Sequence, residues 1–174
     1  MNSIYATKIF QLAEEHTDEI FYNSSAEHAI IVHQALVKNA SKYVCIFSSS
    51  MCSEISNNKE YCNFVDQFLK EDKERYIHIL LTDCHENFAN MPIAQVLAKY
   101  PLQVIIKKYT GQVLYNSKPV HFTVSDDRAF RLETDIERHM AFGNFNSTIQ
   151  AQDLKKVFDQ AFTSEVSIRV NLCN

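Results

Sequence analysis

The sequence predicts a mixed α/β fold, with a mostly parallel central sheet and helices on both faces of that sheet. From about residue 19 to residue 110, short apolar segments alternate with segments in which apolar residues recur at helical spacing. This alternation is typical of parallel sheets, because a crossover helix returns the chain to the start of the next strand. Hydrophobic residues make up 46% and charged residues 22% of the chain, a balance that is typical of globular proteins.

The individual elements follow from apolar spacing and from capping residues. The run 43–47 is continuously apolar, as expected of a strand that is covered on both faces. Ser24 or Ser25 is a candidate N-cap for the helix after the first strand, and Pro101 ends a later helix. The expected helices are 4–15, 24–41, 61–69, 91–100 and 151–162, and the expected strands are 19–22, 43–47, 76–81, 102–106, 120–124, 129–132 and 140–146.

A single domain accounts for all 174 residues, since the chain shows no internal repeat, low-complexity tract or Pro/Gly/Ser-rich linker. Within it we distinguish an N-terminal helix (1–18), β/α repeats (19–110) and a motif region with the C-terminal helix (111–174). No apolar run approaches the roughly 20 residues that span a bilayer. Residues 1–10 also lack the layout of a secretory signal. We therefore expect a cytoplasmic protein that makes no membrane contact.

Glycine is scarce, and its scarcity excludes two nucleotide-binding motifs. Only Gly111 and Gly143 occur, whereas a P-loop or a dinucleotide-binding turn needs several glycines close together. We expect no cofactor. The net charge of -4 argues against a protein that coats nucleic acid in general.

The five cysteines predict reduced, structural thiols rather than a metal site. They are odd in number and show no CxxC spacing. A zinc site is the alternative, with Cys84, His85, Cys52 and Cys62 as ligands, but their spacings match no standard finger or ribbon. We therefore expect no metal. The cysteines are Cys45, Cys52, Cys62, Cys84 and Cys173.

The stretch 120–146 holds the most informative pattern. Residues 120–124 alternate between apolar and polar side chains, the Asp126-Asp127 pair predicts a turn, and residues 129–132 alternate again. A third short strand and turn follow at 140–146, before the last helix. The predicted order of elements therefore changes here, from alternating strands and helices to consecutive short strands.

In this order of elements the chain resembles the phospholipase D superfamily. That family carries His-x-Lys, four residues and then Asp on a strand and turn, followed by a Gly-Ser-x-Asn strand end and a helix with a Phe-Asp pair. Here residues 120–126 are similar to the motif strand, residues 141–144 to the second element, and Phe158-Asp159 to the helix pair. The resemblance covers about residues 19–162 and implies a phospholipase D-like fold.

The catalytic signature is degenerate in both possible registers. If Asp126 is the family's aspartate, Pro119 stands at the nucleophilic histidine and His121 at the lysine. If His121 is the family's histidine, Thr123 stands at the lysine and Arg128 at the aspartate. The resemblance implies a reaction in which a histidine attacks phosphorus while lysines hold the phosphate charge. Neither register preserves that set of groups.

One catalytic and four binding residues are the site candidates. His121 either faces a cleft, where it binds an anion or attacks phosphate, or is a strand histidine held by Asp126 or a backbone carbonyl. Arg131 is either an anion clamp over the cleft or a structural partner of Asp126. Lys118 supplies positive charge, and Asp126, at the end of the motif strand, is a further binding candidate. Asn144 alone matches the family's second element, because Phe142 takes the place of its serine.

Other polar residues bear on the site less directly. Ligands of open α/β sheets bind outside the carboxyl ends of the strands, so the loops 48–50, 82–85 and 107–109 would line any cleft. Charges of both signs nearly cancel through the C-terminal half, which is typical of a solvated surface. Glu133 is one of these charges, and we expect it to face the same way as Phe130.

The resemblance implies two functions. The first is a catalytically inactive phospholipase D-like domain that acts as a binding or assembly subunit in a bacterial nucleic-acid-processing or antiviral defence complex. The second is an active, metal-independent phosphodiesterase or nuclease with a rearranged site that uses His121. Single-motif members of the family pair their motifs by dimerisation, so the resemblance also implies a homodimer or a subunit of a larger complex, with nucleic acid as a possible ligand.

Overall fold

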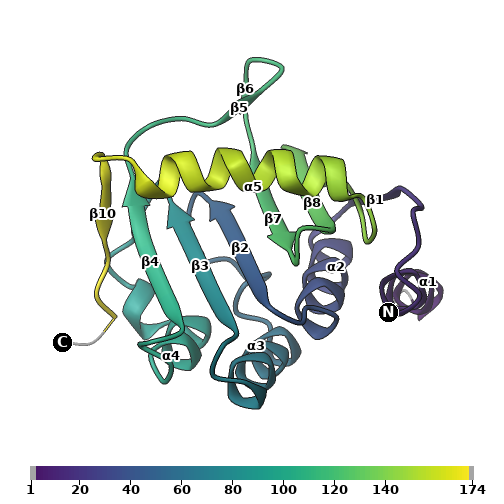
Figure 1. The fold of residues 1–174 in the computed structure, drawn as a ribbon, viewed down its shortest axis with the longest axis horizontal. Coiled ribbons are helices and arrows are strands. Elements are labelled where there is room, and N and C mark those ends of the chain that lie inside the picture. The colour runs from purple at the N-terminus through teal and green to yellow at the C-terminus, as the bar shows by residue number, and fades with distance from the viewer. Residues whose placement is uncertain (1–2, 173–174) are drawn as a thin grey trace.

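The computed structural model describes residues 3–172. These residues form an eight-stranded mixed sheet with the strand order β1-β9-β8-β7-β2-β3-β4-β10 (Figure 1). A separate two-stranded hairpin, β5-β6, projects from the body. The strands of the large sheet are β1 (Phe21–Ser24), β2 (Tyr43–Ser48), β3 (Tyr76–Leu81), β4 (Val104–Tyr109), β7 (His121–Ser125), β8 (Ala129–Asp135), β9 (Met140–Asn144) and β10 (Ser167–Arg169); those of the hairpin are β5 (Leu114–Tyr115) and β6 (Lys118–Pro119).

The predicted mixed α/β class is confirmed, and its parallel part is confined to three strands. β2 pairs with β3 and β3 pairs with β4 in parallel, in the region of β/α alternation. The remaining contacts, from β1 through β9, β8 and β7 to β2 and from β4 to β10, are antiparallel. Short turns join β7 to β8 and β8 to β9, and connections this short are possible only between antiparallel neighbours.

The helices begin at residues that the local sequence favours. Ser25 caps α2 by accepting the N–H of His28. Asn58 caps α3 in the same way, with bonds from the N–H groups of Glu60 and Tyr61. Pro92 occupies the first turn of α4, where a missing N–H costs nothing. The helices are α1 (Ser3–Glu14), α2 (Ala26–Lys38), α3 (Lys59–Glu71), the 3-10 turn η1 (Phe88–Asn90), α4 (Pro92–Leu97) and α5 (Thr148–Thr163).

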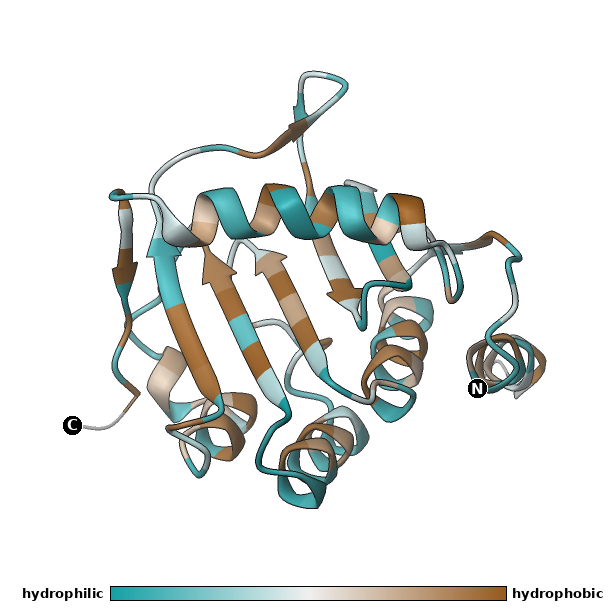
Figure 2. Ribbon diagram, viewed as in Figure 1, coloured by the Kyte–Doolittle hydropathy of each residue, from teal (hydrophilic) through white to brown (hydrophobic). Residues whose placement is uncertain are grey.

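Helices cover both faces of the sheet, as the sequence predicts. α5 crosses one face, and its buried residues Phe158 and Phe162 pack on Phe122 and neighbouring strand residues. On the other face lie α2, α3 and α4 (Figure 1). Figure 2 shows hydrophobic residues along β2, β3 and β4, where both faces are covered. Strand β2 is accordingly buried along nearly its whole length.

The N-terminal helix α1 packs at one end of the molecule. Ile9, Leu12 and Ala13 of α1 contact a small core that includes α2 and Phe21 of β1. At the opposite end of the sheet, β10 pairs with β4 close to the C-terminus. Among the described residues, no helix combines the length and the apolar character that crossing a membrane requires.

Candidate functional site

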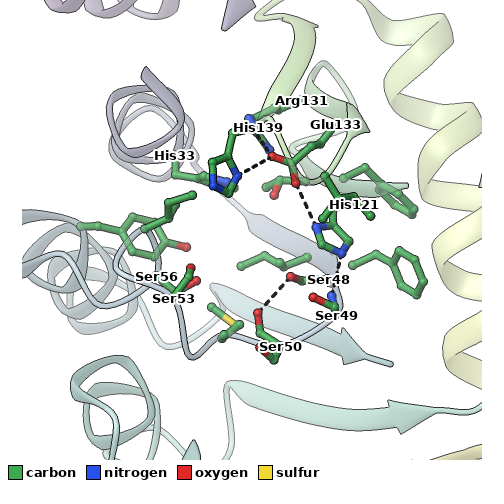
Figure 3. Close-up of a pocket in the computed structure, with 18 residues that line it drawn as sticks. His33, Ser48, Ser49, Ser50, Ser53, Ser56, His121, Arg131, Glu133 and His139 are labelled. Atoms are coloured by element: carbon green, nitrogen blue, oxygen red, sulfur yellow. Dashed lines mark hydrogen bonds and ion pairs between the residues drawn. The ribbon is translucent and has the colours of Figure 1, made fainter. Parts of the chain in front are cut away.

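A pocket opens between the sheet and helix α2, at the carboxyl end of β2. It has a cavity volume of about 140 Å³. The loop after β2 forms one wall, α2 and α3 contribute His33 and Tyr61, and β7 and β8 contribute the opposite wall (Figure 3). Parallel strands present ligand sites at this edge, and the prediction that loop 48–50 lines a cleft agrees with it. The loops 82–85 and 107–109 do not line the pocket.

A chain of hydrogen bonds runs across the sheet from His121 to Asn23. His121 on β7 lies opposite Glu133 on β8, and its Nδ1 is 2.9 Å from Oε2 of that carboxylate. The other oxygen, Oε1, accepts a bond of 2.8 Å from the Arg131 guanidinium. Arg131 also donates from Nε to the Asn23 side chain, at 3.1 Å. Arg131, Glu133 and Asn23 are all buried. Such buried ionic groups persist only when each is bonded on all sides.

The ring of His121 is held at both nitrogens. The backbone N–H of Ser49 donates to Nε2 over 2.9 Å. Because Nε2 accepts this bond, the ring proton sits on Nδ1 and points to Glu133. Figure 3 shows the imidazole between these two partners. The lone pair that would attack a phosphorus atom is therefore already engaged.

Glu133 is ionised in this arrangement. Burial alone would raise its pKa, but the hydrogen bond with His121 and the charge of Arg131 outweigh burial and lower the pKa to about 2. His139 adds a third partner, with Nδ1 at 3.4 Å from Oε1. Among the described residues of the lining, the Glu133 carboxylate and the Arg131 guanidinium are the one such pair, and their charges cancel each other.

His33 faces the same pocket from α2 and is predicted to make folding sensitive to acid. Burial, followed by the charge of Arg131, lowers its pKa to about 3 from the ordinary value of 6.5. The unfolded chain binds a proton below pH 6.5 while the folded chain does not, so stability falls as the pH decreases from 6.5 toward 3. We expect His33→Gln to flatten this decline when unfolding by urea is measured at pH 7 and at pH 5. An unchanged pH dependence would show that His33 is readily protonated in the folded protein.

The predicted site residues separate into two groups. His121 and Arg131 line the pocket. Asn144 lies outside it: the side chain is buried, donates to Asp18 at 2.8 Å and accepts the N–H of Asn146 at 2.7 Å. Lys118 is exposed on β6, in the projecting hairpin. Asp126 also lies outside the pocket, in the β7–β8 turn.

Asp126 acts as a structural clamp. Its carboxylate accepts the backbone N–H groups of Ser41, Lys42 and Tyr43, and also the hydroxyl of Ser41. These bonds tie the β7–β8 turn to the segment between α2 and β2. Neither expected partner of Asp126 is found there: His121 and Arg131 both bond Glu133 instead. The backbone at Asp126 has a φ of 54°, which aspartate tolerates better than most residues.

The expectation that Glu133 faces the same way as Phe130 is wrong. Side chains alternate along a strand, so Glu133 shares its face with Arg131, two residues earlier, and not with Phe130. Applied correctly, alternation alone would have placed Arg131 and Glu133 together. Two further pocket residues, His33 and His139, carried no such signal, because each lies on a different element and is brought in by the tertiary fold.

The structure favours one of the two motif registers. Pro119 ends the exposed hairpin strand β6 and does not line the pocket. His121 and Thr123 both line the pocket from β7. If His121 takes the place of the family's histidine, the lysine position holds Thr123, a buried side chain without charge.

The cysteines form no metal site in residues 3–172. Cys45, Cys52, Cys62 and Cys84 are free thiols, and Cys173 lies outside the described residues. Burial raises the pKa of the Cys45 thiol to about 12. In the described part of the chain, no group of three or more His, Cys, Asp or Glu side chains is arranged to hold a metal ion.

Comparisons with known proteins bear on the family and the fold. A family model described as a domain of unknown function (DUF7931) matches residues 25–169. No curated protein sequence matches the chain. Among solved structures, NucT from Helicobacter pylori is similar with a TM-score of 0.57 and 11% identity, over 87% of this chain and 100% of that one.

Two further structures share the fold. Nuc from Salmonella typhimurium, a phospholipase D family member, has a TM-score of 0.60 and 9% identity, over 88% of this chain and 98% of that one. TrmBL2, an archaeal chromatin protein with a novel mode of DNA binding, has a TM-score of 0.55 and 9% identity, over 93% of this chain and 58% of that one. The predicted phospholipase D-like fold is therefore confirmed.

Proposed function

The chain belongs to the DUF7931 family, and we propose that it is a phospholipase D-like domain that binds a ligand without cleaving it. One observation carries this proposal: the N–H of Ser49 occupies Nε2 of His121. A histidine nucleophile needs that lone pair free, and it needs cations to stabilise the phosphate. Thr123 carries no charge, and the guanidinium of Arg131 is already paired with the carboxylate of Glu133.

An assay of phosphodiester cleavage tests this function. The protein is incubated in the presence of a metal chelator with each of three substrates in turn: bis-p-nitrophenyl phosphate, single-stranded DNA and RNA. We expect release of product no faster than in buffer, and no difference between the protein and its His121→Ala variant. Cleavage by the protein that disappears in the variant would contradict the proposal.

A second candidate function is an active phosphodiesterase that uses His121, and one contact favours it. The carboxylate of Glu133 orients Nδ1 of the ring, as the partner of a nucleophilic histidine should. Catalysis would then require the loop of Ser49 to move and release Nε2. The same assay separates the two functions, because only this one predicts turnover that depends on His121.

We infer the biological setting from a protein that shares this fold. We propose a homodimer, or a subunit of a larger complex, that acts in nucleic-acid processing or antiviral defence. Support comes from the DNA binding stated for TrmBL2, which shares the fold. Light scattering at micromolar concentration tests self-association, and a monomer alone would contradict the homodimer.

The single-domain organisation of residues 1–174, with its three predicted regions, is likewise proposed. Support comes from the continuous sheet, which joins β1 near the N-terminus to β10 near the C-terminus.

A further inference from the structure

We propose that the pocket binds an uncharged, single-ring heterocycle of the pyrimidine type rather than a phosphate. This inference rests on the proposed function, since it concerns the same pocket and requires that its ligand is not cleaved. Three features of the lining lead to it: its charge balance, its size, and the mixture of rings and free hydroxyl groups on its walls.

The charge balance disfavours an anion. Among the described residues that line the pocket, Arg131 is the only Lys or Arg, and its side chain has an exposed fraction of 3%. It already bonds the Glu133 carboxylate and the Asn23 side chain. A phosphate in the pocket would lie near the ionised Glu133 without an available cation, and desolvating a charge without a partner is costly. A neutral ligand meets no such penalty.

The size of the pocket fits one ring. Its cavity volume of about 140 Å³ is comparable with the roughly 150 Å³ of an engineered apolar cavity that binds benzene. A pyrimidine base has a single six-membered ring and fits this space. A purine has two fused rings, which exceed it unless the surrounding loop moves.

The walls combine aromatic surface with unused hydrogen-bonding groups. His33 and Tyr61 place two neighbouring rings on the wall formed by α2 and α3, and ring faces are suited to stacking on a base. Within residues 3–172, Ser49, Ser53 and Ser56 make their hydrogen bonds through backbone groups, which leaves their hydroxyls available to a ligand. Each hydroxyl can both donate and accept. The edge of a pyrimidine base presents donors and acceptors side by side, which matches such a set.

Titration calorimetry with uridine, adenosine, ribose and inorganic phosphate tests this ligand class. We expect one-site binding of uridine, adenosine weaker by at least about tenfold because its base is larger, and no heat from ribose or phosphate. Binding of phosphate or ribose in preference to uridine would overturn the inference. So would an absence of uridine binding at millimolar concentration.

A pair of serine variants locates the binding. Ser53 is exposed on the pocket rim, and Ser24 is exposed on the edge strand β1, outside the pocket. We expect Ser53→Leu to narrow the mouth and weaken uridine binding by at least about tenfold, and Ser24→Leu to leave it unchanged. Should Ser53→Leu fail to fold, Ser56→Ala, which removes one hydroxyl, is expected to weaken binding as well. Equal affinities in all variants would overturn the assignment to this pocket.

Two oligonucleotides identify the source of the base. If the ligand is an unpaired base within a nucleic-acid strand, a short oligo(dT) binds more tightly than uridine, and oligo(dA) does not. If the ligand is a free nucleoside, oligo(dT) binds no more tightly than uridine. The cleavage assay stays separate from these measurements. Turnover of a phosphodiester contradicts the proposed function whatever uridine does, whereas missing uridine binding without turnover overturns this inference alone.

Discussion

Replacement of Glu133 by alanine is expected to lower the free energy of unfolding by about 3–5 kcal/mol, because it leaves a buried guanidinium without its counter-charge. Arg131 retains only its bond to Asn23 in this variant, and His121 loses the acceptor of its Nδ1–H. Unfolding in urea, followed by circular dichroism, measures the change. Glu137, an exposed residue that follows the same strand, provides the control. Glu137→Ala should change stability by less than about 0.5 kcal/mol.

A double variant distinguishes the loss of charge balance from the loss of packing. When both charged partners are replaced by apolar residues of similar size, the desolvation cost of each disappears together with their attraction. Arg131→Met/Glu133→Leu should therefore be more stable than Glu133→Ala. A double variant that is less stable than Glu133→Ala would show that the remaining bond from Arg131 to Asn23 stabilises the protein more than the unpaired guanidinium destabilises it.

Replacement of Asp126 by alanine is the second large effect that we expect. Its carboxylate accepts three backbone N–H groups and one hydroxyl from the segment that joins α2 to β2. Those donors lose their partner in the variant, so unfolding should become easier by about 2–4 kcal/mol. Thermal unfolding and urea titration both report this change.

Asp127→Ala is the matched control for this position. Asp127 has the same φ of 54°, so alanine is equally strained at either site. Its side chain, however, serves mainly one partner, the hydroxyl of Tyr43. Asp126→Ala should lower the free energy of unfolding by about 1–3 kcal/mol more than Asp127→Ala does. Equal costs would mean that backbone strain, not the clamp, accounts for the effect.

The sequence predicted the elements of the fold well wherever burial alone decides the pattern. Strand β2 is covered on both faces, and its continuous run of apolar residues predicts this burial. The helix α2 has a capping serine and a strong apolar spacing. The pairing of β7 with β8 and β9 is less evident, because alternation assigns the faces of a strand but not its neighbours. The parallel part of the sheet is correspondingly smaller than the β/α alternation suggests.

The site was predicted only in part. His121 and Arg131 do line the pocket, since each is the polar member of an alternating strand. Asp126 and Asn144, the acidic and amide residues that best match the family's pattern, bind backbone and side-chain partners elsewhere. No local pattern marks the bond from Ser49 to His121, because it joins a loop and a strand that only the fold brings together. That contact occupies the nitrogen with which His121 would attack a phosphate.

The central claim is that His121 does not act as a nucleophile, and an experiment that quenches the reaction at alkaline pH tests it most directly. The protein is mixed with excess bis-p-nitrophenyl phosphate, quenched under conditions that preserve phosphohistidine, digested and analysed by mass spectrometry. Because the N–H of Ser49 occupies Nε2, we predict that the peptide containing His121 carries no substrate-derived phosphoryl group. A phosphorylated peptide that is absent from the His121→Ala variant would contradict this account.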